Sequence, residues 1–389
     1  MNLNNSQQLQ IAVVIQNYTR IGGAERYCVE LTERLARQHK VHVYCQSIGT
    51  SQSKDIQFHI IPKRLDKPRY INDLLFARWV RQATENKFDI IHAHARIPHA
   101  NVQTLHVPCI LSRYTEISGL KKFLRYLNTA ISPRMLSYLW LEKQQLCTKN
   151  NRQIIAVSEF LAKNILCSYP EISQNINIAY PGIQVDSMPE VRVSSRNKQR
   201  TLLNISEENF TLLFIANNYK NKGLGVLLEA IHQINDSNIH LIFAGNDSPE
   251  KFIDQVKGFQ LTRNVHFMGV CEDMNTLYPA ADALVHPTLS DTYAMVVLEA
   301  MAYSLPVIVS NKNYCGFSEH LSANEAILID NPKDSTEIAT HIKTLLNNPK
   351  HCLFLAKNGH KKTQSITWEQ TLEQTLLAYG KSLAGNKHV

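Results

Sequence analysis

Short runs of β-branched and other apolar residues alternate with longer helical patterns along the whole chain. This alternation restricts the possible folds more than any other feature of the sequence, because strands separated by helices are typical of parallel sheets with crossover helices. The first half predicts strands at 11–17, 41–47, 88–94, 102–108, 153–158 and 176–182. The second half predicts a further series at 211–217, 239–245, 265–270, 283–288, 306–311 and 326–330.

The two series of strands predict two domains. The chain has 389 residues, more than a single hydrophobic core usually serves. Residues 184–209 are polar and without a clear period, which indicates a linker and the first turn of a second domain. We therefore expect an α/β protein with doubly wound, Rossmann-like domains at 1–183 and 184–364, facing a central cleft at the carboxyl ends of their strands. The apolar stripe after residue 364 predicts a helix over 365–389 that packs back on the first domain.

Composition and charge exclude several classes of protein. The sequence is 44% hydrophobic and 19% charged, as in globular proteins, and it contains no segment resembling a signal peptide or a transmembrane helix. Its eight cysteines include no CxxC pair, which indicates reduced thiols and a cytoplasmic protein. Residues 1–182 hold 23 Lys and Arg against 12 Asp and Glu, a net charge of +11, whereas the remainder holds 18 against 21, a net of −3. The basic first half favours an anionic partner: nucleic acid, a phosphorylated substrate or an anionic membrane.

Two loops carry residues suited to a phosphate. Gly22 and Gly23 in IGGAER follow the first strand and open a helix, where close backbone approach and free N–H groups favour an anion. A simple strand-to-helix turn is an equally good interpretation, and the segment is not the GxGxxG pattern of nicotinamide enzymes. In NNYKNKG, Lys222 follows the first strand of the second half, where a lysine can neutralise a phosphate. Its alternative is a solvated loop lysine.

The segment SDTYAMVVLEAMAYSLPVIVSN (290–311) places Asp291 and Glu299 eight positions apart in an apolar run. Capping residues at its start predict a helix from Asp291 to about Ser304. Eight helical residues span about 12 Å, roughly a nucleotide diphosphate with a sugar at each end. We expect the carboxylates to hold those two ends and the diphosphate to meet the unpaired N–H groups of the first turn. These groups belong to Tyr293, Ala294, Met295 and Val296.

Glu299 lies in so apolar a helix that we expect it to have a hydrogen-bonding partner. The alternative is that Asp291 is only a cap and that Glu299 lies on the solvent face. Four histidines, His92, His94, His99 and His106, surround two predicted strand ends, but their spacing matches no zinc motif. The chain also lacks a DxD pair, and we expect chemistry without a metal.

These segments resemble glycosyltransferase family 4, the retaining enzymes of the GT-B fold. The likeness rests on GGAER, KGLGVLLEAI, LIFAGND, NVHFMGV and YPAADALVHPTLSDTYAMVVLEAMAYSLPVIVS. It extends over most of residues 10–380, is most specific between 211 and 311 and is loose between 50 and 150. Within the family, the chain is most similar to the glucosyltransferases that extend the inner core of bacterial lipopolysaccharide.

The resemblance implies a role for each candidate residue. Glu299 matches the residue that holds the ribose hydroxyls, and Asp291 stands where the family usually has a glutamate touching the donor sugar. Gly22, Gly23 and Lys222 match contacts to the diphosphate, and Val270 matches the loop whose backbone meets the base. His106 is the best match to the histidine near the transferred sugar, with His94 as second choice. Catalysis is thus expected from His106, Asp291 and Lys222.

Four positions depart from the family pattern. Asp291 is one methylene shorter than the family glutamate, and Asn221 replaces an arginine found in many relatives. Two family glycines are Ala294 and Ser304 here. These replacements put the donor sugar in doubt and narrow the approach to the phosphates.

The implied reaction is transfer of a hexose, glucose by first choice, from a UDP-sugar to a lipopolysaccharide core or similar lipid-linked acceptor, with retention and without a cofactor. The first domain would bind the acceptor and the second the nucleotide sugar. Residues 118–132 interleave leucines with Lys121, Lys122 and Arg125, as in a helix lying on an anionic membrane, which would place the enzyme on the inner face of the cytoplasmic membrane. An ordinary surface helix is the alternative there.

Two other functions stay open at this point. One is a GT-B transferase for capsule or another cell-surface glycan, which would use the same site. The other is a nucleotide-sugar-binding protein without transfer activity. Nucleic acid is disfavoured as a partner because no basic and aromatic platform or known binding motif occurs.

Overall fold

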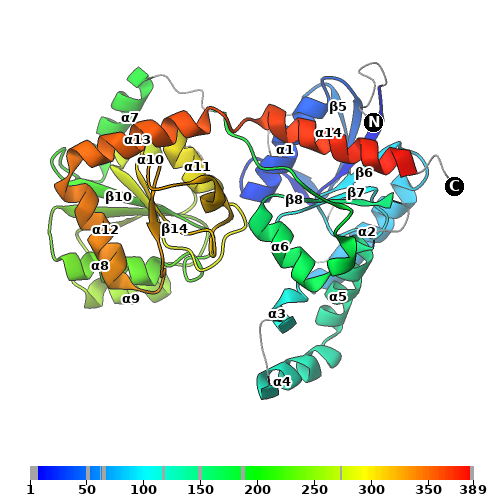
Figure 1. The fold of residues 1–389 in the computed structure, drawn as a ribbon, viewed down its shortest axis with the longest axis horizontal. Helices are drawn as coiled ribbons and strands as arrows, with labels where there is room; N and C mark the ends of the chain where they lie inside the picture. The colour runs from blue at the N-terminus through cyan, green and yellow to red at the C-terminus, as the bar shows by residue number, and fades with distance from the viewer. Residues whose placement is uncertain are drawn as a thin grey trace. The chain divides into compact units, whose positions relative to one another are not determined.

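The computed structural model describes residues 8–49, 53–61, 63, 67–115, 119–147, 151–184, 189–271 and 274–385. The chain forms two compact units (Figure 1). The first comprises residues 1–182 and 368–389, and the second comprises residues 183–367. Each has its own parallel sheet, and each is an α/β domain of Rossmann type.

The first unit is built on seven parallel strands in the order β5-β3-β1-β6-β7-β8-β9. Their bounds are β1 (Gln10–Val14), β3 (Lys40–Cys45), β5 (Ile56–Ile60), β6 (Ile90–Ala93), β7 (Val102–Leu105), β8 (Gln153–Ala156) and β9 (Ile176–Ile178). A short parallel pair, β2 (Asn17–Tyr18) and β4 (Ser47–Ile48), lies beyond two of these strands. All six strands predicted for the first half are confirmed. The sequence missed β5, because this edge strand buries only Ile56 and has an exposed Gln57 and a half-buried His59 in place of an apolar run.

Helices cover both faces of this sheet. They are α1 (Gly23–Leu35), α2 (Arg69–Thr84), α3 (Ser112–Thr115), α4 (Gly119–Ala130), α5 (Pro133–Leu146), α6 (Glu159–Ser168), a 3₁₀ turn η2 (Pro170–Ile172) and α14 (Trp368–Gly385). The last of these, drawn in red in Figure 1, lies against α1 and β8. Trp368 is buried there against Tyr27, and the Tyr379 hydroxyl lies 2.8 Å from His92 Nδ1, so the C-terminal helix completes the core of the first unit.

The second unit has six parallel strands in the order β12-β11-β10-β13-β14-β15. Their bounds are β10 (Phe210–Ile215), β11 (Ile239–Ala244), β12 (Val265–Phe267), β13 (Ala283–His286), β14 (Val307–Ser310) and β15 (Ile327–Ile329), as predicted for the second half. Its helices are α7 (Pro189–Leu202), α8 (Leu224–Ile234), α9 (Glu250–Gly258), α10 (Met274–Ala280), α11 (Met295–Ala302), η3 (Gly316–His320), α12 (Ser335–Asn347) and α13 (Pro349–Thr363).

One segment differs from its prediction. The polar stretch expected to be a linker contains α7, which packs against α10. Arg200 is almost fully buried, and its guanidinium reaches Asp282 at 3.2 Å, while Arg196 reaches the same carboxylate at 2.7 Å. The guanidinium groups on this helix bind a carboxylate and backbone carbonyls. The helix has no regular spacing of apolar residues from which it could have been predicted.

Within the part of the chain that is described, no helix combines the length and apolar character needed to cross a bilayer.

Candidate functional site

The glycine turn of the first unit forms the start of α1. Gly22 has φ 99° and ψ 147°, and a Cβ atom there would lie 2.5 Å from Glu25 Oε2. The backbone angle therefore requires glycine, and a larger residue would also displace the Glu25 carboxyl group. Glu25 is not among the residues predicted from the sequence, yet its carboxyl group lies beside the N–H groups expected to meet a diphosphate. Burial raises the pKa of Glu25, and a hydrogen bond from its own backbone opposes the shift.

The histidines of the first unit divide into two kinds. His92 is fully buried between Tyr379 and Thr104, with Nε2 2.7 Å from Thr104 Oγ1, and His99 lies 2.8 Å from Thr84 Oγ1. These two support the fold. His94 follows β6 and His106 follows β7, and His94 Nδ1 lies 3.0 Å from His106 Nε2. The structure therefore brings the two candidate histidines together at the carboxyl edge of the sheet.

This histidine pair is neutral at pH 7. Burial lowers the pKa of His106 to about 4, and burial with the neighbouring histidines lowers the pKa of His94 well below its usual value. His94 Nε2 is buried without a hydrogen-bond partner among the described residues. Because a bare nitrogen lone pair is cheaper to bury than an orphaned N–H, we assign the His94 proton to Nδ1, which donates to His106.

The histidine pair lines a cavity of about 200 Å³. Gln16, Asp73 and Arg96 line it too, and Gln16 Nε2 donates to Asp73 Oδ1 at 2.6 Å. The sequence predicted none of these three, although Gln16 and Arg96 follow β1 and β6, and polar residues just after a parallel strand are the signal that could have found them. Glu142 also lines the cavity, but it accepts hydrogen bonds from the N–H groups of Ile110 and Leu111, so it holds the loop after β7.

In the second unit, Lys222 and Asp291 form an ion pair. Lys222 Nζ lies 2.6 Å from Asp291 Oδ2 and donates to the Ser290 carbonyl at 2.9 Å. The loops that carry them are joined further by Asn221, whose side chain donates to the same carbonyl. Gly223 makes this approach possible, because its φ is 85° and a Cβ atom would lie 2.2 Å from the Pro287 carbonyl oxygen.

His286 completes this cluster and is not among the predicted residues. It ends β13, is almost fully buried, and its Nε2 lies 3.0 Å from Asp291 Oδ2. Burial lowers its pKa, with Asp291 opposing, so the neutral ring donates its Nε2–H to the carboxylate. Burial by itself raises the pKa of Asp291, but the charge of Lys222 and the hydrogen bonds from His286 and Lys222 hold that pKa well below its usual range. Its position at the end of a central strand is the sequence feature from which His286 could have been predicted.

The start of the following helix differs from its prediction. α11 begins at Met295 rather than at Asp291, and Ala294 is its N-cap with φ 61° and ψ 62°. Asp291 Oδ1 accepts from the N–H groups of Tyr293 at 3.2 Å and of Ala294 at 2.9 Å, so these two amides are not free for a diphosphate. The estimate of about 12 Å between the carboxylates assumed eight helical residues. Residues 291–294 are not helical, so the helical rise does not give this distance. Met295 and Val296 open the helix, and the described residues offer their N–H groups no acceptor.

Glu299 and Val270 lie at two other places in the second unit. The half-buried Glu299 accepts a hydrogen bond at Oε2 from the Tyr278 hydroxyl, which confirms that this carboxylate has a partner. Tyr278 is buried and stacks on Tyr303, with ring centroids 5.0 Å apart. Val270 is 56% exposed and follows Gly269, whose φ is 64°. Across the described ranges, no group of three or more His, Cys, Asp and Glu side chains is placed to hold a metal ion.

The sequence matches two descriptions of glycosyltransferases. Residues 21–187 match the family described as Glycosyltransferase Family 4, and residues 195–362 match the family described as Glycosyl transferases group 1. The lipopolysaccharide glucosyltransferase WaaG of Escherichia coli K12 is 24% identical over 356 residues, which cover 90% of this chain and 92% of that protein. The alpha-monoglucosyldiacylglycerol synthase of Acholeplasma laidlawii is 23% identical over 310 residues, 76% of each protein.

Solved structures share the fold of both units. The crystal structure of WaaG, a glycosyltransferase involved in lipopolysaccharide biosynthesis, matches with a TM-score of 0.82 at 22% identity, over 94% of this chain and 98% of that chain. The Anabaena protein HepE in complex with UDP and glucose matches with a TM-score of 0.71 at 17% identity, over 95% and 98% of the two chains. With a family match on each unit and two parallel-sheet domains that share this architecture, the chain belongs to glycosyltransferase family 4 and has the GT-B fold.

Proposed function

We propose that this glycosyltransferase moves a hexose, glucose by first choice, from UDP to the core of a lipopolysaccharide or a similar lipid-linked acceptor, with retention and without a divalent metal. The name of WaaG supports the sugar and the acceptor, and the complex of HepE with UDP and glucose supports the nucleotide. The second unit would hold the donor and the first unit the acceptor.

The ion pair between Lys222 and Asp291 is the observation that carries this proposal. Its two members are a cation suited to a diphosphate and a carboxylate suited to sugar hydroxyls. They lie at the carboxyl edge of the sheet, next to the start of α11. When a nucleotide sugar binds, its diphosphate takes Lys222 from Asp291, and Asp291 Oδ2 is then available to a hydroxyl of the sugar. His286 keeps its hydrogen bond to the carboxylate and fixes its position.

The proposed chemical step needs no protein nucleophile. The acceptor oxygen forms a bond to the anomeric carbon on the face from which the diphosphate departs, and the bond to the diphosphate breaks. The acceptor proton passes to an oxygen of the leaving phosphate. Lys222 and the N–H groups of Met295 and Val296 stabilise the charge that develops on this leaving group, while the neutral His106 positions the sugar.

A membrane contact through α4 is part of the proposal. Leu120, Phe123, Leu124 and Leu127 on this helix are between 48% and 72% exposed, and Ile131 after the helix and Trp140 on α5 are exposed too. Figure 1 shows α4 lying away from the sheet of the first unit. Arg125 is on the same helix, whereas the side chains of Lys121 and Lys122 lie outside the described residues. Exposed apolar residues interleaved with basic ones suit the inner face of the cytoplasmic membrane and a lipid-linked acceptor.

Transfer from radiolabelled UDP-glucose to lipopolysaccharide with a truncated core tests the function. Lys222→Met should abolish most transfer, whereas Lys220→Met, two residues away and exposed, should preserve it. EDTA should leave the rate unchanged. Analysis of the product should show that the transferred sugar keeps the anomeric configuration that it has in the donor. The proposal fails if UDP binds but no sugar reaches the acceptor, or if the product is inverted.

Sedimentation with vesicles tests the membrane contact separately. Binding to vesicles containing anionic lipid should fall in the double variant Phe123→Ser, Leu127→Ser. The matched control is Leu353→Ser, Phe354→Ser, which removes two exposed apolar residues from α13. Equal sedimentation of the two variants would contradict a role for α4.

A further inference from the structure

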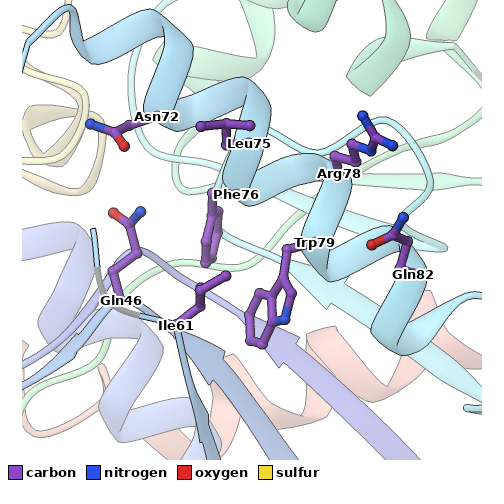
Figure 2. A pocket seen from close by; sticks show the side chains of 8 residues that line it. All are labelled: Gln46, Ile61, Asn72, Leu75, Phe76, Arg78, Trp79 and Gln82. Carbon is purple, nitrogen blue, oxygen red and sulfur yellow. The ribbon is translucent and has the colours of Figure 1, made fainter. Parts of the chain in front are cut away.

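A second cavity of the first unit lies between α2 and the ends of two strands. It has a volume of about 270 Å³. Figure 2 shows Gln46 and Ile61 reaching it from the strand side, with the rings of Phe76 and Trp79 pointing toward them from α2. Gln46 follows β3 and Ile61 follows β5, so this cavity opens at the carboxyl edge of the sheet.

This cavity adjoins the one lined by the His94–His106 pair. In the sheet order β5-β3-β1-β6-β7, the second cavity lies at the ends of β5 and β3, and the histidine cavity lies at the ends of the neighbouring β1, β6 and β7. Two connections join them. The Gln46 N–H donates to the Gln16 carbonyl at 2.8 Å, and Asn72, which lines the second cavity, precedes Asp73, which binds Gln16. The two cavities thus form consecutive parts of one track along the first unit.

The lining of the second cavity is half polar and half apolar, a mixture that suits the hydroxyl groups and C–H faces of a sugar. The amides of Gln46, Asn72 and Gln82 each carry both donors and an acceptor, which match the hydroxyl groups of a sugar. Trp79 supplies an aromatic surface of the kind against which the C–H face of a sugar ring packs. Trp79 is itself supported by Tyr44, with ring centroids 5.6 Å apart.

Arg78 gives the cavity a positive charge. It lies one turn before Arg81 on α2, but the two differ in their partners. Arg81 is engaged by Glu85 at 2.9 to 3.1 Å, whereas no carboxylate among the described residues pairs with Arg78. Arg78 is exposed, and an exposed guanidinium that lines a cavity without a paired carboxylate can bind an anionic group through two parallel hydrogen bonds.

We propose that this second cavity binds a non-reacting saccharide of the acceptor that carries an anionic substituent, a phosphate or a carboxylate. The acceptor is then an oligosaccharide extended along the edge of the first unit, with its reacting end at His106 and the next charged unit at Arg78 and Trp79. This inference rests on the proposed function, because it assigns the acceptor to the first unit. It adds that the enzyme distinguishes acceptors by a charge outside the reacting sugar.

Acceptor kinetics and direct binding test this inference together. The probes are lipid-free core oligosaccharides released from lipopolysaccharide, in phosphorylated form and after removal of phosphate, and an oligosaccharide carrying a uronic acid. For the phosphorylated probe, Arg78→Gln should raise KM and the Kd measured without donor by about tenfold, with kcat within about twofold. For the dephosphorylated probe, the variant should equal the wild type. The uronic acid probe shows whether a carboxylate serves as well as a phosphate.

Matched variants keep the result interpretable. Arg81→Gln removes the same charge from the same helix and should leave both constants unchanged. Trp79→Phe, which keeps a ring against Tyr44, should weaken both forms of the acceptor equally. If Arg78→Gln binds and uses the phosphorylated probe as the wild type does, the inference is wrong although the proposed function stands. If no probe is a substrate, the binding constants still test the cavity, and equal Kd values for wild type and Arg78→Gln overturn it.

Discussion

Lys222 Nζ and Asp291 Oδ2 lie 2.6 Å apart in the second unit, and each side chain is less than one-fifth exposed. The pair joins the loop before α8 to the loop before α11, with His286 and the amides of Tyr293 and Ala294 on the remaining oxygen positions of the carboxylate. Every acceptor direction of Asp291 is therefore occupied. The same contacts that organise the proposed donor site also stabilise the fold.

Removing the charge of Asp291 should destabilise the protein. Asp291→Asn leaves Lys222 partly buried without a counter-charge, and we expect a loss of about 3 kcal/mol in the free energy of unfolding. Urea denaturation at pH 7 measures it. Glu159→Gln is the control, since Glu159 pairs with Lys163 at 3.6 Å on an exposed helix face, and this change should cost less than about 0.5 kcal/mol. Similar losses in the two variants would contradict a special role for the Asp291 pair.

The Asp291 pair also predicts a dependence of stability on pH. The pKa of Asp291 is held below its value in the unfolded chain, about 3.9. Its contribution is therefore fully present above about pH 5 and is lost progressively as the pH falls below about 4 toward the folded pKa. The difference in unfolding free energy between wild type and Asp291→Asn should shrink over this range, and a difference that stayed constant would refute the assignment.

The histidine pair should act in a different pH window. His106 has a folded pKa of about 4, below the ordinary 6.5, so the unfolded chain binds its proton first as the pH falls. Stability should decline between pH 6.5 and 4, and His106→Asn should remove about 1–2 kcal/mol of the decline between pH 7 and 5. Unfolding curves of wild type and variant at both pH values measure this. Parallel pH profiles would mean that the environment of the half-buried His106 does not lower its pKa.

Much of the fold could be predicted because parallel strands buried on both faces leave continuous apolar runs. The central strands follow this rule, as IAVV in β1 and VIVS in β14 illustrate. The rule fails for elements whose buried side chains are few or polar. β5 is an edge strand in which only Ile56 is buried, and α7 buries Arg200 against carbonyls, so neither leaves the expected pattern.

The candidate site was predictable only as far as its residue types. Asp291, Lys222, His94 and His106 could be chosen from their places after strands, but their pairing depends on loops whose approach no local pattern encodes. Pro287 and Gly223 must touch before Lys222 can reach Asp291. The place of His286 at the end of a central strand marks it as a candidate, but the sequence does not show that it meets the carboxylate five residues later.

Two residues with left-handed backbone angles stand where the family pattern has glycine. Ala294 has φ 61° and Ser304 has φ 59°, at the positions where the family resemblance leads one to expect glycines. Such angles strain a residue with a Cβ atom by about 1–2 kcal/mol. Glycine removes this strain, but its greater conformational entropy in the unfolded chain offsets part of the gain. Ser304→Gly should therefore stabilise the protein by about 0.5–1 kcal/mol, measured by urea denaturation. Ala302→Gly, in the helix just before, is the control and should destabilise it.

Gly223 should tolerate no side chain. Its φ is 85°, and a Cβ atom at this position would lie only 2.2 Å from the Pro287 carbonyl oxygen, so Gly223→Ala forces the two loops apart. We expect a loss of more than about 2 kcal/mol and a weaker affinity for UDP, since Lys222 moves with the loop. Gly258→Ala is the control, because a Cβ at this helical position meets nothing within 4 Å. Unfolding free energies and UDP titration calorimetry would separate the two, and a stable Gly223→Ala protein would contradict the contact.

The hydroxyl of Tyr278 should matter to the nucleotide through Glu299. Tyr278→Phe retains the stacking on Tyr303 but removes the donor to Glu299 Oε2. Because Glu299 is half-buried, we expect a modest loss of about 1 kcal/mol in stability. If the carboxylate holds the ribose, its freer side chain should also weaken UDP binding several-fold, whereas binding of the acceptor oligosaccharide should be unchanged. Calorimetric titration of both ligands measures this, and an equal loss for both would show that Tyr278 acts only on the fold.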